Sequence, residues 1–273
     1  MRFPLLLLFV SVVLQGAELR IVEGKVQRVE GGPGLLSSEA FLPGEMVHFS
    51  HQLQNFTRKE NAVQVRFLAK PHDPKGSPLA PDIAGQISVS LQQEDKDWVP
   101  TLRGSFYLPP LLLGGIYQIS LQAWDDIAGS TTQGEISFSV SGPTIDPSPG
   151  LAIRAIQFYR SEEDDRPLER SVYRAGEPIN ARFTIVGYRV SAQKEVDVVY
   201  GVKLTDSTGH VLFEEPSAAE DKSSGFYPKP YVPATLTFSI KPETPVGEFQ
   251  LTVTARDRIG GSQAEAAAAF RLE

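Results

Sequence analysis

The sequence of 273 residues contains no cysteine. It therefore has no disulfide, no thiol nucleophile, no cysteine-ligated metal and no cysteine that could carry a lipid anchor. Histidine, with four residues, and methionine and tryptophan, with two each, are also scarce. Exported domains of about 120 residues can bury enough apolar surface to fold without disulfides. The lack of cysteine thus excludes several kinds of chemistry and remains compatible with export.

Positive charge is in the minority. The chain has 26 lysines and arginines against 33 aspartates and glutamates, which gives a formal net charge of −7. Proteins that bind nucleic acid present a basic surface to the phosphate backbone. We therefore expect no nucleic acid among the partners of this protein.

Long apolar runs are absent after the first residues. Residues 1–17, MRFPLLLLFVSVVLQGA, place one basic residue, Arg2, before an apolar run that ends at Leu14. The run is shorter than the about 20 residues that span a bilayer, and its pattern is typical of a secretory signal peptide. An uncut N-terminal anchor is the alternative. We expect a secreted or periplasmic bacterial protein with no membrane span after signal cleavage.

The rest of the chain contains one segment twice. Gly115 to Gly129 reads GIYQISLQAWDDIAG, and Gly247 to Gly261 reads GEFQLTVTARDRIGG. The two copies are separated by about the length of one globular domain. In both, apolar residues alternate with polar ones, which predicts a half-buried strand. The mature chain is therefore expected to consist of two related domains.

Further strands follow in the same order in both copies. The turn sequences LPGE, at Leu42 to Glu45, and RAGE, at Arg174 to Glu177, each precede an alternating strand. About seven strands are expected per copy, and no helix. The alanine-rich stretch Ala264 to Ala269 is predicted as a strand from its counterpart in copy one. In copy two, a short strand at Val211 to Phe213 is expected to lead into a long polar loop that ends at Gly225.

These motifs resemble those of known domains. The PGE-type entry, the Gly-x-Tyr/Phe-x-apolar strand and the Ala-x-Asp-x-x-Gly turn are similar to those of immunoglobulin-like or fibronectin-type-III-like domains of exported bacterial proteins. The resemblance implies β-sandwich domains used for adhesion, spacing or binding. The chain departs from these domains in two ways. First, Ile119 and Leu251 occupy the place of the second cysteine of a true immunoglobulin domain. Second, Tyr117 can form a tyrosine corner, whereas Phe249 in the other copy has no hydroxyl with which to form one.

We therefore predict an all-β fold of two tandem antiparallel β-sandwich (immunoglobulin-like) domains. The expected division is a signal peptide (residues 1–17), domain 1 (18–142), a proline-rich linker (143–150) and domain 2 (151–273).

The four histidines lack a catalytic pattern. His48 and His51 are three apart, so on a strand they face opposite sides and cannot share a metal. His51 has the inward phase and is interpreted as a core or edge residue, with a functional role as the alternative. His72 and His210 have no partner at a diagnostic spacing, and no hydrolase motif is present. We expect no catalytic residue and no enzyme; a Ser-His-Asp triad assembled by the fold is the least favoured alternative.

Acidic residues cluster at two turns. Asp125, Asp126 and Asp257 lie between an inward-facing strand and a glycine. Such carboxylates either bind calcium or accept backbone N–H bonds that shape the turn. A single repeated aspartate favours the turn, so we expect no metal and no cofactor. The run Glu162 to Asp165 is interpreted as a solvated loop, with a weak cation site as the alternative.

The most unusual loop is Gly225 to Pro233, GFYPKPYVP. Phe226, Tyr227 and Tyr231 stand among its prolines, and copy one has Trp98 in about the same place. Stiff aromatic loops bind protein or carbohydrate partners at low entropic cost. These four aromatic residues are therefore the predicted binding residues. The alternative is that the rings cover one end of their own sandwich.

The sequence favours a non-enzymatic, monomeric binding, adhesion or spacer module that acts through loops and edge strands. The alternative is a periplasmic chaperone-like protein that donates an edge strand to a partner subunit, with Ile136, Phe138 and Val140 as the candidate strand. The internal repeat argues against this alternative, because the two domains of such chaperones differ from each other.

Overall fold

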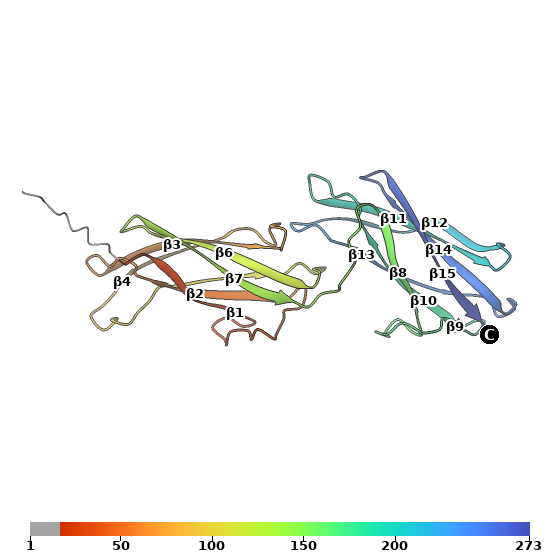
Figure 1. The fold of residues 1–273 in the computed structure, drawn as a ribbon, viewed down its shortest axis with the longest axis horizontal. Coiled ribbons are helices and arrows are strands. Elements are labelled where there is room, and N and C mark those ends of the chain that lie inside the picture. Colours follow the sequence, from red (N-terminus) through yellow and green to blue (C-terminus); the bar gives the residue numbers. More distant parts are fainter. Residues whose placement is uncertain (1–16) are drawn as a thin grey trace, which may run out of the picture.

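The computed structural model describes residues 17–273, and their regular secondary structure consists of β-strands (Figure 1). The strands form two sandwiches that follow one another along the long axis of the molecule. The predicted signal peptide lies almost entirely outside the described residues. Among residues 17–273, no helix has the length and apolar character needed to cross a membrane.

The first sandwich contains β1 to β7, in two antiparallel sheets. One sheet has the order β1-β2-β5 and the other the order β4-β3-β6-β7. The strands are β1 (Arg20–Gln27), β2 (Met46–Gln54), β3 (Ala62–His72), β4 (Ile83–Ser90), β5 (Thr101–Tyr107), β6 (Gly115–Asp125) and β7 (Ser130–Val140).

The second sandwich repeats this order. Its sheets are β13-β10-β8 and β12-β11-β14-β15-β9, where β9 is a two-residue strand that joins the end of β15 in parallel. The strands are β8 (Ala152–Tyr159), β9 (Val172–Tyr173), β10 (Pro178–Val186), β11 (Glu195–Asp206), β12 (Val211–Ser224), β13 (Val232–Ser239), β14 (Gly247–Asp257) and β15 (Ser262–Leu272). The predicted fold of two tandem β-sandwiches is confirmed.

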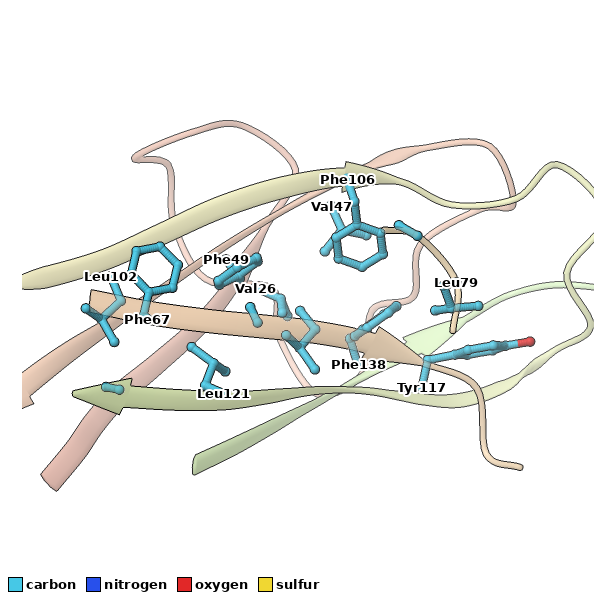
Figure 2. Packing of buried hydrophobic residues seen from close by; sticks show 14 of the residues in the cluster. Val26, Val47, Phe49, Phe67, Leu79, Leu102, Phe106, Tyr117, Leu121 and Phe138 are labelled. Carbon is cyan, nitrogen blue, oxygen red and sulfur yellow. The ribbon is translucent and has the colours of Figure 1, made fainter. Parts of the chain in front are cut away.

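Alternation along the strands forms both cores. In β2 every second side chain is buried, from Val47 to Leu53, and the other face is more exposed. Figure 2 shows the apolar side chains of the first sandwich gathered between its two sheets. Phe138 stacks on Tyr117, with 6.0 Å between ring centroids, and meets Phe41 and Phe106 edge-on. Burial of each such ring contributes about 1.5–3 kcal/mol to folding.

The tyrosine corner forms in the first sandwich. The hydroxyl of Tyr117 donates a hydrogen bond to the carbonyl oxygen of Leu113, at 2.9 Å. Phe249 has no hydroxyl, and it stacks on Phe270 instead. In the second sandwich, a different residue uses the same kind of bond: the buried hydroxyl of Tyr173 donates to the carbonyl oxygen of Tyr159, at 2.8 Å.

One predicted loop is wrong. The chain after Phe213 is not a polar loop but continues as β12, which pairs with β11 along its length. Both faces of β12 are largely exposed, so this edge strand lacks the apolar alternation that identifies a half-buried strand. Pro216 lies where the register shifts, opposite Gly201, and prolines are found on edge strands and at bulges. The alanine-rich stretch within β15 is a strand, as predicted.

Candidate functional site at the junction of the sandwiches

The predicted aromatic loop lies at the junction. It connects β12 to β13 and contacts the first sandwich, because the ring of Tyr227 packs against the first core. The Tyr227 hydroxyl donates a hydrogen bond to Oδ2 of Asp73, at 3.0 Å. Asp73 follows β3 and is only 7% exposed. A residue of the second sandwich thus completes the polar contacts of a buried carboxylate in the first.

The Asp73 carboxylate also shapes its own turn. Its Oδ1 accepts hydrogen bonds from the backbone N–H of Lys75 and of Ser77, at 2.8 and 2.7 Å. Burial and, after it, the charge of Asp73 together raise the pKa of Tyr117 to about 12. Burial, followed by the charge of Asp73 and the hydrogen bond to it, likewise raises the pKa of Tyr227. Both tyrosines therefore stay protonated at neutral pH, so Tyr227 remains a donor.

The loop is also fixed to its own sandwich. The Tyr188 hydroxyl donates to the carbonyl oxygen of Lys229, at 2.7 Å, and the Lys194 ammonium donates to that of Phe226, at 2.5 Å. Lys229 forms a salt bridge of 2.7 Å with Asp221. A loop fixed in this way loses little conformational entropy when it binds a partner.

A groove of about 840 Å³ opens beside this loop. The first sandwich contributes the start of β4, the end of β5 and the prolines that follow β5, and the second contributes residues 223–227, Lys194, Val196 and Lys229. Two large rings in the lining are exposed: Tyr107, at 67%, and Phe226, at 45%. The ammonium of Lys194 lies 4.2 Å from the centroid of the Phe226 ring, within the range of a cation–π contact.

The four predicted binding residues have different surroundings. Phe226 and Tyr227 both line the groove, but the Tyr227 ring is engaged with the first sandwich. Tyr231 is 8% exposed. Trp98 lies apart from the groove, in the connection between β4 and β5, where it meets Phe56 edge-on.

Sequence reasoning missed three residues of this site. Tyr107 could have been identified from the sequence, because it is a large ring at the outward phase of a predicted strand. No sequence pattern indicates Asp73 or Lys194 as site residues, because their contacts join positions far apart in the sequence.

The repeated aspartates shape their turns, as expected. Asp125 accepts hydrogen bonds from the N–H groups of Ile127 and Ala128 on Oδ1 and from that of Thr57 on Oδ2. Asp257 does the same in the second sandwich, with donors from Ile259, Gly260 and Arg189. Each carboxylate therefore joins the turn after its strand to a second loop.

Asp126 and Glu162 pair with neighbouring side chains. Asp126 forms a two-pronged salt bridge with Arg66, with both contacts at 2.7 Å, and these hydrogen bonds lower the pKa of Asp126. In the run of acids after Ser161, Glu162 accepts a hydrogen bond from the Thr237 hydroxyl. Within the described part of the chain, no three histidine or carboxylate side chains are grouped as metal ligands are.

Two histidines take defined places. His51 is buried, as predicted, and burial lowers its pKa to about 4. His72 has a partner that sequence spacing did not indicate: its Nε2 lies 2.8 Å from the Ser120 hydroxyl. Its Nδ1 faces the backbone carbonyl oxygen of Asp73, at 3.2 Å. A hydrolytic triad instead places a carboxylate at that nitrogen.

The strand named for donation to a partner belongs to the first core. Phe138 and Val140 of β7 are buried. The outer edge of β7 is covered at its end, because the N–H of Phe41 donates to Ser139 and the carbonyl oxygen of Phe41 accepts from Ser141. These side chains are therefore already used within the sandwich.

Neither a protein-family model nor a curated protein matches this sequence. The solved structures that match the chain include three with low TM-scores. The C-terminal domain of the Streptococcus pyogenes antigen I/II-family protein AspA has a TM-score of 0.30 at 11% identity, over 92% of this chain and 99% of that one. The C-terminal domain of the Streptococcus agalactiae AgI/II polypeptide BspA has a TM-score of 0.32 at 10% identity, over 92% and 100%.

The third is red sea bream transglutaminase, with a TM-score of 0.27 at 10% identity. That likeness covers 94% of this chain and only 31% of the transglutaminase. Likenesses at these TM-scores carry no information about function.

Proposed function

We propose that this protein is an exported, non-enzymatic binding module whose groove between the sandwiches receives a protein or carbohydrate partner. One observation carries the proposal: Tyr107 of the first sandwich and Phe226 of the second present exposed rings to the same groove. Exposed aromatic rings in a concave surface are the usual anchors of a binding site.

The groove is well suited to binding because both walls are fixed. Its second wall is held by the bonds from Tyr188 and Lys194 to the loop backbone, and its position relative to the first wall by the bond from Tyr227 to Asp73. A partner therefore meets a surface that needs no reordering, and this keeps the entropic cost of association low.

Export is the second part of the proposal and rests on residues 1–17. The direct test is N-terminal sequencing of the protein recovered from the culture medium or the periplasm. A mature chain that begins near residue 18 supports export with cleavage. A chain that retains residue 1 contradicts it.

Binding is tested by affinity capture from the native extracellular or periplasmic fraction. The full mature chain is compared with a groove variant, Tyr107→Ala with Phe226→Ala. The matched control is Ile116→Ala with Val246→Ala, which removes two exposed apolar side chains outside the groove lining. We expect partners to be captured by the original chain and by the control, and to be lost from the groove variant. Equal capture by all three forms would overturn the groove as the binding surface and move the search to the edge strands. No capture by any form would favour a spacer role.

A further inference from the structure

Two strands of the first sandwich have an open edge near the groove. In the part of the chain that the structure describes, β5 is paired in its sheet with β2 alone, and β4 with β3 alone. An open edge presents backbone N–H and C=O groups that can pair with another extended chain.

Backbone hydrogen bonds show which groups of β5 point outward. The N–H of Leu108 donates to Glu45, at 2.9 Å, and the N–H of Leu53 donates to Pro100, at 3.0 Å. These two bonds continue the β2–β5 register by one position at each end. Hydrogen-bonded and non-hydrogen-bonded pairs alternate along an antiparallel ladder, so the even-numbered residues of β5 bond to β2. Ser105 and Tyr107 therefore direct their backbone groups away from β2, toward the open edge.

The outward-facing groups lie in the groove. Ser105 and Tyr107 both line it, together with Ile83 of β4 and Phe226 of the second sandwich. The spacing of N–H and C=O groups along a strand edge matches another polypeptide backbone. A carbohydrate has no such regular partner groups. The edge therefore favours a peptide over a sugar as the occupant.

The charge in the groove favours an acidic peptide. Lys229 is already paired with Asp221, and Asp82 is paired with Lys70. Lys194 forms no salt bridge within the described residues, and its ammonium lies on the Phe226 ring. A carboxylate from a partner would complete the contacts of this cation.

We propose that the groove binds an extended, acidic segment of a protein partner, which adds to β5 as a further strand. The backbone of the segment pairs with Ser105 and Tyr107, an apolar side chain packs against Phe226 and Ile83, and a carboxylate faces Lys194. This proposal rests on the proposed function, because it names the class of partner for the same groove.

The test uses the full mature chain and peptides selected on it from a displayed library of short random sequences. The first variant is Ser105→Pro, which removes one outward N–H and leaves every hydrogen bond to β2 in place. Its matched control is Ser88→Pro on the open edge of β4. The N–H of Leu91 donates to Asn61 across the β3–β4 register, so the odd residues of β4 bond to β3 and Ser88 faces outward. Proline is tolerated at such edge positions.

We expect Ser105→Pro to weaken binding of the selected peptides about tenfold or more, and Ser88→Pro to leave it unchanged. A second measurement does not depend on the folding of any variant. Two sets of peptides are compared, one N-methylated at the odd and one at the even positions. One set should lose affinity for the unmodified chain and the other should retain it, because only alternate N–H groups of the peptide face β5.

The outcomes separate this proposal from the proposed function. Peptides that bind Ser105→Pro as tightly as the original chain, and tolerate N-methylation in both sets, overturn strand addition. If Phe226→Ala still weakens binding in that case, the groove remains the binding surface. A library that yields no peptide sensitive to Phe226→Ala overturns the peptide proposal. Binding to sugars that depends on Phe226 but not on Ser105 would also overturn it and would leave the groove as a carbohydrate site.

Discussion

The hydroxyl of Tyr227 and the carboxylate of Asp73 form a hydrogen bond of 3.0 Å between residues 154 positions apart, and this bond joins the two sandwiches. Asp73 is nearly buried, and its other oxygen is already used by two backbone N–H groups. The bond therefore satisfies an acceptor that water reaches poorly, and it keeps the walls of the groove at a fixed separation.

We expect Tyr227→Phe to loosen the junction. The variant keeps the ring on the first core but removes the donor to Asp73, which should lower the free energy of unfolding of the first sandwich by about 1–3 kcal/mol. Both tryptophans, Trp98 and Trp124, lie in that sandwich, so urea unfolding followed by tryptophan fluorescence measures the effect. The control is Tyr107→Phe, whose ring is exposed, and it should unfold like the original chain. An unchanged midpoint for Tyr227→Phe would show that the bond contributes nothing to stability.

Asp125→Ala should destabilise the first sandwich by about 2–4 kcal/mol, because three backbone N–H groups lose their common acceptor. Asp257→Ala should do the same to the second sandwich. Tryptophan fluorescence reports only the first sandwich, so its midpoint should fall for Asp125→Ala and change little for Asp257→Ala. Circular dichroism should detect both changes.

Removal of calcium should leave the unfolding midpoint of the original chain unchanged, because backbone N–H groups already occupy the oxygens of Asp125 and Asp257. The measurement is thermal unfolding with and without a chelator. A lower midpoint with the chelator would revive the calcium interpretation of these turns.

His51 should make the first sandwich sensitive to acid. Burial lowers its pKa from 6.5 to about 4, so the unfolded chain binds a proton more readily than the folded one. The stability that depends on a neutral His51 is fully present above pH 6.5 and is lost as the pH falls toward about 4, by about 3 kcal/mol in all.

The test is His51→Leu, which cannot be protonated. Unfolding is followed by tryptophan fluorescence at about pH 7 and about pH 4.5, and the variant should lose clearly less stability between them than the original chain. His210→Leu, which removes an exposed histidine, should retain the original pH dependence. Equal losses in all three chains would show that His51 does not carry the effect.

Gly85→Ala should destabilise the first sandwich by about 1–3 kcal/mol. Gly85 lies directly opposite Phe67, and a Cβ atom at this position would collide with the Phe67 ring. The added Phe67→Leu substitution should recover part of the loss, because the shorter side chain leaves room for the methyl group. Gly150→Ala is the control, since nothing lies within 4 Å of its Cβ position.

The fold could be predicted from the sequence because burial of one face of a strand leaves alternating apolar and polar residues in the sequence. The inward residues of β2 and β10 are apolar, except His51, which can be buried in its neutral form. The resulting alternation identifies both segments as strands. Because of the repeat, each strand could be predicted from two copies of the sequence. Comparison with copy one identified the alanine-rich β15 as a strand. β12 was missed because an edge strand with two exposed faces has no such pattern.

The site could be predicted only in part. A loop rich in aromatic residues and proline marks a special surface, but the same ring can bind a partner or pack against a neighbouring domain. Which of these happens to Tyr227 depends on Asp73 and on the first core, which no local pattern places beside it. Phe226, one position earlier in the loop, remains exposed.

The charged residues of β12 make the second sandwich less prone than the first to associate with other chains through an edge strand. Two copies of the chain that meet along β12 bring together two strands that each carry Glu214 and Glu215 without a salt bridge within the described residues, and like charges repel. The end of β5 carries no charge at Ser105 or Tyr107. This repulsion therefore discourages sheet growth between chains through the second sandwich, and it leaves the neutral edge in the groove as the place where charge opposes pairing with a foreign strand least.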